Sequence, residues 1–227
     1  MSSSSSPRTR RFAGVAAGAA AAVLFTGCAV ANSEGTSTGA DSDALRVVLS
    51  QEPPTLEPCE ANLTSTGVVV RSNITEPLVE RDPTSGELDP LLATAWEQTG
   101  DTEWTFTLQE GVTFQDGSPF NAEAAAFSID RAVNSDLGCN VEGYVFGDDD
   151  LGVEAVDDTT LVITTPSPDP ILPLKLSFIE IVPTSTDTSA KVREPVGTGP
   201  YAVAQWDAGT RLTLERYDDY WGDAQIG

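Results

Sequence analysis

Three cysteines and the absence of histidine limit the chemistry that this chain can do. The cysteines are Cys28, Cys59 and Cys139, and none of the 227 residues is a histidine. Histidine is the commonest general base and metal ligand near neutral pH. No serine or cysteine stands in the pattern of a nucleophile elbow. The residue types therefore argue against a hydrolase and a zinc site, and they predict no catalytic residue, cofactor or metal ligand.

The first cysteine follows a segment with the features of an export signal. A basic stretch with three arginines precedes an apolar run over residues 12–25. That run is shorter than the ~20 residues that a helix needs to cross a bilayer. It ends in Phe-Thr-Gly-Cys, which resembles a bacterial lipobox with Phe25 in place of the usual leucine. We expect residues 1–27 to be a signal peptide and Cys28 to be lipidated. A plain secretory signal with an incidental cysteine, or a twin-arginine signal, is the alternative.

The segment that follows Cys28 has the composition of a flexible tether. Residues 28–43 are mostly serine, threonine, glycine and acidic residues. Such a composition cannot bury enough apolar surface to order itself. We expect it to join a lipid anchor to a folded domain on the extracytoplasmic face of the bacterial cell membrane, in the periplasm or cell-wall space.

With Cys28 lipidated, Cys59 and Cys139 remain as a pair. Exported chains meet an oxidising environment, which favours a disulfide between two remaining cysteines. The bridge would close a loop of about 80 residues and contribute about 2–5 kcal/mol to stability. Two buried free thiols are the alternative.

The charge of the chain limits its partners. It carries 12 basic and 35 acidic residues, a net charge of −23. Nucleic-acid binding needs basic patches, and so acidic a chain is also repelled by anionic lipid headgroups. We therefore expect no nucleic-acid partner and a membrane link through the lipid alone. The acidity either favours cationic ligands or is simply that of a solvated surface.

Apolar patterning predicts a chain of mixed α and β elements. Strict alternation over Trp104–Leu108 is typical of a half-buried strand, and Asn121 is a good N-cap for a helix reaching about Asn134. The patterns also predict a strand over 44–50, helices over 64–75 and 91–97, hairpins over 153–164 and 200–216, a resumed strand over 112–114, and an irregular loop over 135–150.

Two motifs resemble ligand-binding loops but lack the neighbouring residues that such loops need. Gly197-Thr198-Gly199 is followed by a proline and a strand, not by the helix N-terminus of a phosphate-binding loop. The acidic run Asp148–Asp150 lacks the glycine turn and terminal glutamate of an EF-hand. We interpret both as structural.

Two longer motifs carry a family resemblance. Residues 85–120, with Leu-Ala-Thr-Ala-Trp, Phe-Thr-Leu and Phe-Gln-Asp-Gly, and residues 195–222, with Gly-Thr-Gly-Pro-Tyr and Tyr-Trp-Gly, are similar to the signatures of family 5 solute-binding proteins of ABC importers. The resemblance covers residues 45–222 and implies the peptide, nickel and opine type of that family.

The resemblance implies an α/β fold, the two-lobed periplasmic-binding-protein-like fold of type II, cluster C. Residues 44–70 and 168–227 would form an incomplete main lobe I with a mixed sheet, and residues 71–167 an inserted subdomain. Family members run to more than twice this length, so the resemblance also implies that this chain is an N-terminal portion and that the second lobe would lie beyond residue 227.

The resemblance implies a monomer that captures oligopeptides and delivers them to an ABC permease driven by an ATPase. In peptide-binding relatives the loop after the first strand contacts the ligand. The resemblance therefore implies that the corresponding residues of this chain contact ligand: Ser50, Gln51, Glu52 and Pro53. Glu52 would pair with a peptide amine, or would be a surface acid. Tyr201 and Trp221 are expected in the core. Opine, oligosaccharide or metal-chelate binding within the family, and a structural or adhesive lipoprotein outside it, are the alternatives.

Overall fold

The computed structural model describes residues 44–147 and 149–222. The signal peptide predicted over 1–27, the tether over 28–43 and the lipidated Cys28 lie outside the described residues. The chain divides into two units at the bond between Val47 and Val48. Residues 44–47 belong to the first unit and are exposed. The second unit starts at Val48 and contains the helices and strands.

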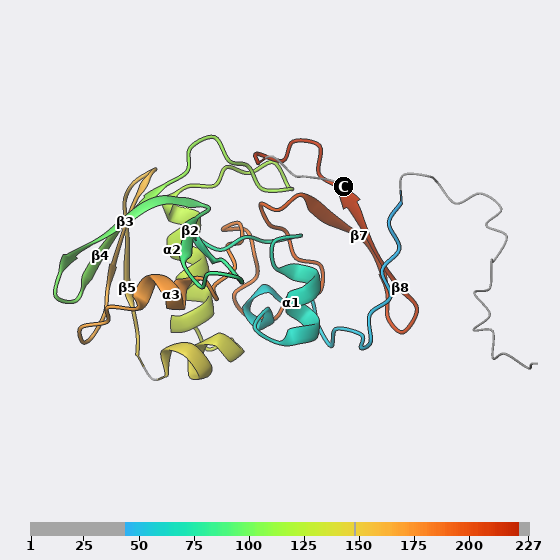
Figure 1. Cartoon of the computed structure of the whole chain (residues 1–227), viewed down its shortest axis with the longest axis horizontal. Coiled ribbons are helices and arrows are strands. Elements are labelled where there is room, and N and C mark those ends of the chain that lie inside the picture. Colours follow the sequence, from blue (N-terminus) through green and yellow to red (C-terminus); the bar gives the residue numbers. More distant parts are fainter. Residues whose placement is uncertain (1–43, 148, 223–227) are drawn as a thin grey trace, which may run out of the picture. The chain divides into compact units, whose positions relative to one another are not determined.

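A four-stranded antiparallel sheet is the largest element of this unit (Figure 1). Its strands lie in the order β3 (Ala93–Gly100), β4 (Glu103–Leu108), β6 (Thr160–Thr164) and β5 (Gly152–Asp157). The predicted strand over Trp104–Leu108 is confirmed as β4, with Phe106 and Leu108 buried. The predicted hairpin over 153–164 is confirmed as β5 and β6.

Helix α2 (Ala122–Ile129) packs against this sheet (Figure 1). Asn121 caps it as predicted, because its side chain accepts a hydrogen bond from the Ala124 N–H at 3.0 Å. The buried face of α2 and the sheet belong to one apolar core, which also receives α3 (Leu172–Leu176). Beyond Ile129 the chain continues in a π-helical turn, Asp130–Asn134.

The hairpin of β7 (Tyr201–Asp207) and β8 (Arg211–Arg216) packs against a second, smaller core. This core contains one face of helix α1 (Thr64–Val70) and the buried Leu56 and Ile74. A 3-10 turn, Pro58–Glu60, precedes α1. A short hairpin of β1 (Val79–Arg81) and β2 (Leu88–Pro90) lies between α1 and β3 in the chain. The hairpin predicted over 200–216 and the start of the helix at Thr64 are thus confirmed.

The short helix predicted over 91–97 is wrong, since residues 93–100 form β3. Leu92 and Trp96 are four apart, which suits one face of a helix. In the structure the segment pairs along its length with β4, with Trp96 opposite Phe106 and Glu97 opposite Thr105. The backbone hydrogen bonds and side-chain packing of a neighbouring strand outweigh a weak local preference for helix.

The strand predicted over 44–50 does not form within the part of the chain described. Residues 44–50 have exposed side chains, including Leu45 and Val48 at 89% exposure each. An apolar, β-branched run becomes a strand only when a neighbouring strand satisfies its backbone groups. The run by itself therefore does not determine the structure.

Three smaller predictions also need correction. The strand predicted over 112–114 is reduced to one isolated bridge, between Thr113 and Pro119. The loop predicted over 135–150 contains a π-helical turn, Glu142–Phe146. Helix α1 ends at Val70, five residues before the predicted end near Thr75. None of the helices described is long and apolar enough to cross a membrane.

Candidate functional site

The loop expected to contact ligand has mixed exposure. Ser50, Gln51 and Glu52 are exposed, whereas Pro53 is buried. A carboxylate oxygen of Glu52 accepts a hydrogen bond from the Gly209 N–H, in the turn between β7 and β8, at 2.7 Å. Glu52 thus holds the loop to this turn, and the carboxylate keeps lone pairs for a second donor.

A buried ion pair fixes the chain just after this loop. Glu57 is fully buried and binds the Arg131 guanidinium in a bidentate manner, with N–O distances of 2.7 and 3.1 Å. It also accepts hydrogen bonds from the backbone N–H of Cys59 and of Val192. Glu57 therefore joins three segments that are distant in the sequence, and bidentate arginine pairing fixes their relative orientation.

Cys59 and Cys139 form a disulfide in the structure, with a sulfur–sulfur distance of 2.11 Å and a sequence separation of 80 residues. Both cysteines are buried, at 4% exposure each. The bridge lies between the 3-10 turn, Pro58–Glu60, and the two π-helical turns. Because π-helical turns often occur at functional sites, the surroundings of this bridge are a candidate site.

Four polar side chains lie on the segments that the disulfide joins or bond to those segments, and we call them the disulfide cluster: Glu60, Asn62, Asn140 and Lys191. The Asn62 amide donates to the Asn140 side-chain oxygen at 2.9 Å. The Lys191 ammonium pairs with the Glu60 carboxylate and donates to the Gly138 carbonyl at 3.1 Å. Asn140 and Lys191 are exposed and Glu60 is buried, so the cluster offers an amide and an ammonium group at the surface.

One polar atom of the disulfide cluster has no partner. The side-chain oxygen of Asn62 is buried and receives no hydrogen bond from the residues described. Since buried polar atoms are nearly always paired, such an atom calls for a donor from a water or a ligand. Asn62 and Asn140 are not among the site residues predicted from the sequence. Their proximity to the two cysteines, three residues and one residue away, was the available signal.

The second family motif, residues 195–222, converges on a different group, the carboxylate of Glu76. It accepts hydrogen bonds from the Thr198 hydroxyl at 2.7 Å, the Tyr220 hydroxyl at 2.7 Å and the Trp221 indole N–H at 2.9 Å. Burial raises the pKa of Glu76 above its ordinary value, and these three donors oppose the increase. Burial also raises the pKa of Tyr220. Trp221 packs against the larger core, and Tyr201 is half-buried.

Gln115 joins the first motif to the second. Its amide N–H groups donate to the carbonyls of Ile74, Gly199 and Tyr201, at 3.0, 3.0 and 2.7 Å. Its oxygen accepts from the Gly197 N–H at 3.0 Å. These hydrogen bonds tie both motifs to residues 74–76, so the motifs brace the scaffold.

Residues 44–147 and 149–222 contain no group of three or more cysteine, aspartate or glutamate residues placed to hold a metal. In the disulfide cluster, Lys191 and Glu60 form an ion pair with each other. The exposed groups of Asn140 and Lys191 can recognise a ligand by hydrogen bonds and charge.

Comparisons with known proteins match this chain to one family. The model of the bacterial extracellular solute-binding proteins, family 5 Middle, matches residues 87–226. Protein XP55 of Streptomyces lividans is 32% identical over 221 residues, which are 90% of this chain and 39% of that protein. The glutathione-binding protein GsiB of Escherichia coli strain K12 is 31% identical over 179 residues, 74% of this chain and 33% of GsiB.

A solved structure agrees with these matches. The nickel ABC transporter protein from Bacillus halodurans is 34% identical, with a TM-score of 0.61 over 75% of this chain and 34% of that one. The chain thus spans roughly a third of the length of the relatives it matches. It has part of the mixed α/β fold of type II periplasmic binding proteins, as predicted. The chain belongs to the bacterial extracellular solute-binding proteins of family 5, the binding components of ABC importers.

Proposed function

We propose that this chain is the solute-capturing part of a lipid-anchored protein that binds oligopeptides outside the cell and delivers them to an ABC permease driven by an ATPase. The ligand would leave unchanged, since capture needs affinity and no reaction. Binding would be by a monomer, with residues 44–70 and 168–227 as main lobe I and residues 71–167 as its inserted subdomain.

The observation that carries this proposal is the composition of the disulfide cluster. A peptide presents alternating N–H and C=O groups and two charged termini. Asn62 and Asn140 can donate and accept hydrogen bonds, which suits the backbone, while the exposed ammonium of Lys191 suits a peptide carboxylate. The buried ion pair of Glu57 and Arg131 and the disulfide hold these groups in place before ligand arrives.

The likeness to GsiB supports the same ligand class. Its name states that it binds glutathione, which is a tripeptide with an ammonium and two carboxylates. The predicted loop with Ser50, Gln51, Glu52 and Pro53 would add contacts near the β7–β8 turn, with Glu52 directed to a peptide amine.

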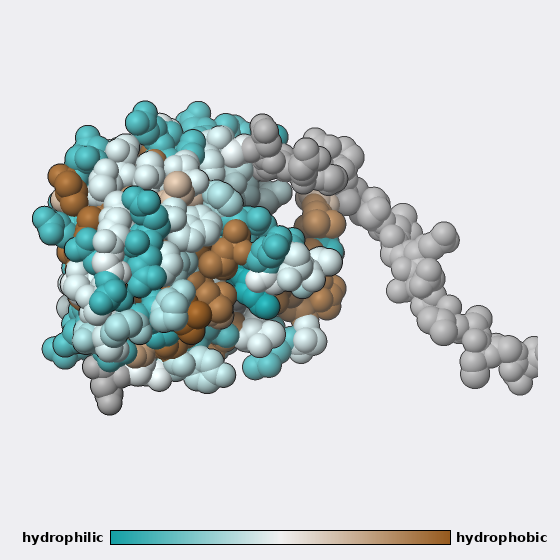
Figure 2. Space-filling view, turned by 60° about the vertical axis from the view of Figure 1, so that its left-hand side comes forward, coloured by the Kyte–Doolittle hydropathy of each residue, from teal (hydrophilic) through white to brown (hydrophobic). Residues whose placement is uncertain are grey.

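The lipid anchor belongs to the same proposal. Cys28 would carry the lipid after removal of residues 1–27, and residues 28–43 would link it to the folded part. Figure 2 shows one face of the molecule, on which hydrophilic residues predominate and hydrophobic ones gather in limited patches. With a net charge of −23, attachment to an anionic membrane would depend on the covalent lipid.

A titration of the chain with defined ligands tests the proposal. The peptide Ala-Ala-Ala and the trisaccharide maltotriose are added separately, and binding is followed through backbone amide NMR shifts. We expect shifts near Asn62 and Asn140 with the peptide and none with the sugar. Asn140→Ala should weaken peptide binding about five- to tenfold, the value of one or two hydrogen bonds.

Gln98→Ala is the matched control, because Gln98 is exposed on β3 and bonds only locally, to the Asp101 carbonyl. It should leave peptide affinity unchanged. Binding of the sugar alone, or equal peptide affinity in the Asn140→Ala variant and the unmodified chain, would rule out the disulfide cluster as a peptide site.

A further inference from the structure

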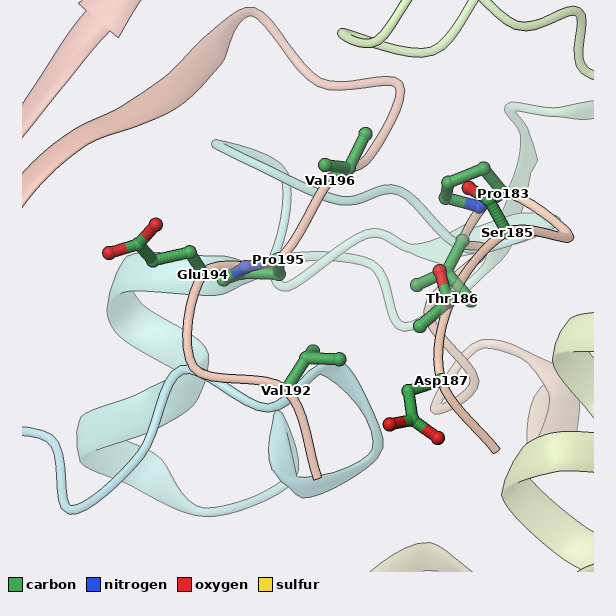
Figure 3. Close-up of a pocket in the computed structure, with 9 residues that line it drawn as sticks. Pro183, Ser185, Thr186, Asp187, Val192, Glu194, Pro195 and Val196 are labelled. Atoms are coloured by element: carbon green, nitrogen blue, oxygen red, sulfur yellow. The ribbon is translucent and has the colours of Figure 1, made fainter. Parts of the chain in front are cut away.

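A small pocket lies beside the segment that carries Lys191 (Figure 3). Its volume is about 180 Å³, well below the ~300–1,000 Å³ of pockets for whole drug-sized ligands. Two stretches of chain line it, residues 182–187 and 192–196. A space of this size suits one side chain of a larger ligand.

The lining is mixed: valine and proline side chains form its apolar part, and the polar or acidic residues are Ser185, Thr186, Asp187 and Glu194. Val182 and Pro183 are buried, and Val192 and Val196 are half-buried. In Figure 3, Val196 and Asp187 lie at opposite ends of the pocket, and the Glu194 carboxylate points away from the other labelled residues. Asp187 is therefore the charged group that a ligand in the pocket would meet.

The charge on Asp187 is maintained by its neighbours. Its carboxylate accepts hydrogen bonds from the Ser189 N–H and hydroxyl, each at 2.7 Å. These bonds hold the pKa of Asp187 below its ordinary value. Two cations of this region pair with other carboxylates, since Arg131 binds Glu57 and Lys191 binds Glu60. The carboxylate is thus ionised and has no ion-pair partner among the described residues.

Two hydrogen bonds, one at each end of the segment 187–192, also hold the pocket in shape. The Asp187 carbonyl accepts a hydrogen bond from the Arg131 guanidinium at 2.8 Å, and the Val192 N–H donates to Glu57 at 2.6 Å. The same ion pair, Glu57 with Arg131, supports the disulfide cluster. The pocket and the cluster are therefore built on one rigid support.

We infer that this pocket receives the side chain of an arginine or lysine residue in a bound peptide. The methylene groups would lie on the valine and proline side chains, and the cationic end would reach Asp187. The net charge of −23 would raise the local concentration of such cations. This inference rests on the proposed peptide capture and adds a preference for cationic peptides.

Two peptides that differ in charge alone test the inference. The neutral residue citrulline has nearly the shape of arginine, so Ala-Arg-Ala is compared with Ala-citrulline-Ala by NMR titration of the chain. We expect Ala-Arg-Ala to shift the amides of Asp187, Val192 and Val196 and to bind about three- to fivefold more tightly, as for an exposed ion pair. Asp187→Asn should abolish the difference, because asparagine keeps an oxygen for Ser189 and loses the charge.

Asp89→Asn is the control, since Asp89 is an exposed aspartate on β2. It removes the same charge from the chain and should leave the preference intact. Equal affinity for the two peptides, with shifts at Asn62 and Asn140 alone, would overturn the inference and leave the proposed function standing. If neither peptide binds, both are wrong.

Discussion

At the scale of single residues, the least usual group is the carboxylate of Glu180. Its side chain is fully buried. It accepts hydrogen bonds from Arg71 Nε at 3.0 Å and the Thr75 hydroxyl at 2.8 Å. Burial raises its pKa to about 7, more than Arg71 and Thr75 lower it, and the nearby Glu76 adds a repulsion. Glu180 therefore titrates near neutral pH in the folded state.

This pKa predicts a pH dependence of stability. Between the unfolded value of 4.5 and the folded value of about 7, the folded state binds more protons, so stability falls as pH rises. The contribution is complete below about pH 4.5 and lost above about pH 7. Glu180→Gln removes this titration. The gap is the difference in unfolding free energy between the unmodified chain and the variant. From pH 5 to pH 8, we expect the unmodified chain to lose about 2–3 kcal/mol of unfolding free energy relative to the variant.

Urea unfolding at both pH values measures that gap. Glu87→Gln is the control, because Glu87 is exposed on the surface, and its gap should stay constant. A gap for Glu180→Gln that is also independent of pH would show that Glu180 keeps the same protonation state across this range.

The pair of Glu57 and Arg131 supports a second prediction at this scale. Arg131→Met leaves the Glu57 carboxylate buried with only backbone donors, and losing one partner of a buried pair costs about 3–5 kcal/mol. We expect a loss of that size in urea unfolding. Arg216→Met, which breaks the exposed pair with Asp218, should cost less than about 1 kcal/mol. Similar losses for the two variants would contradict this role of Glu57.

At the scale of elements, the close approach of two backbone segments explains the glycines of the second motif. A Cβ atom on Gly197 would lie 2.1 Å from the Ile74 carbonyl oxygen, and one on Gly199 would lie 2.6 Å from the Asn73 carbonyl oxygen. Neither distance is possible for real atoms without movement of the backbone. The loop before β7 can therefore contact residues 73–75 only with glycine at both positions.

Gly197→Ala should consequently destabilise the protein by about 1–3 kcal/mol, the usual cost of overpacking. The matched control is Gly143→Ala, because a Cβ on Gly143 meets no atom within 4 Å. Thermal unfolding of the two variants gives the comparison. If the variant at 197 is as stable as the control, the contact between the loop and residues 73–75 is looser than the structure has it.

Elements with a strong local signal could be predicted from the sequence, and those that depend on a neighbour could not. Alternation and turn residues were enough for β4 and both long hairpins, and an N-cap asparagine for α2. The segment at 93–100 has no such pattern and becomes β3 only because β4 lies beside it. For the candidate site, the two cysteines could be paired by counting. Asn62 and Asn140 were not predicted, because folding brings these residues, 78 positions apart, into contact, and their only signal in the sequence is that each lies near a cysteine.

At the scale of the whole molecule, the acidic charge and the proposed lipid anchor have linked consequences. A chain with a net charge of −23 gains nothing from anionic headgroups, so its retention at the membrane would depend on Cys28. Several acyl chains on one cysteine would anchor it stably, whereas without lipid the repulsion would release it.

Cys28→Ala tests this dependence directly. In a bacterial host, the unmodified chain should sediment with membranes and enter the detergent phase of a Triton X-114 partition, and the variant should move to the soluble fraction. Ser37→Ala, which changes one residue of the predicted tether, should behave as the unmodified chain. Since both variants keep the disulfide and the acidic charge, only the acyl group differs. Retention of Cys28→Ala in the membrane would mean that another part of the protein provides the attachment.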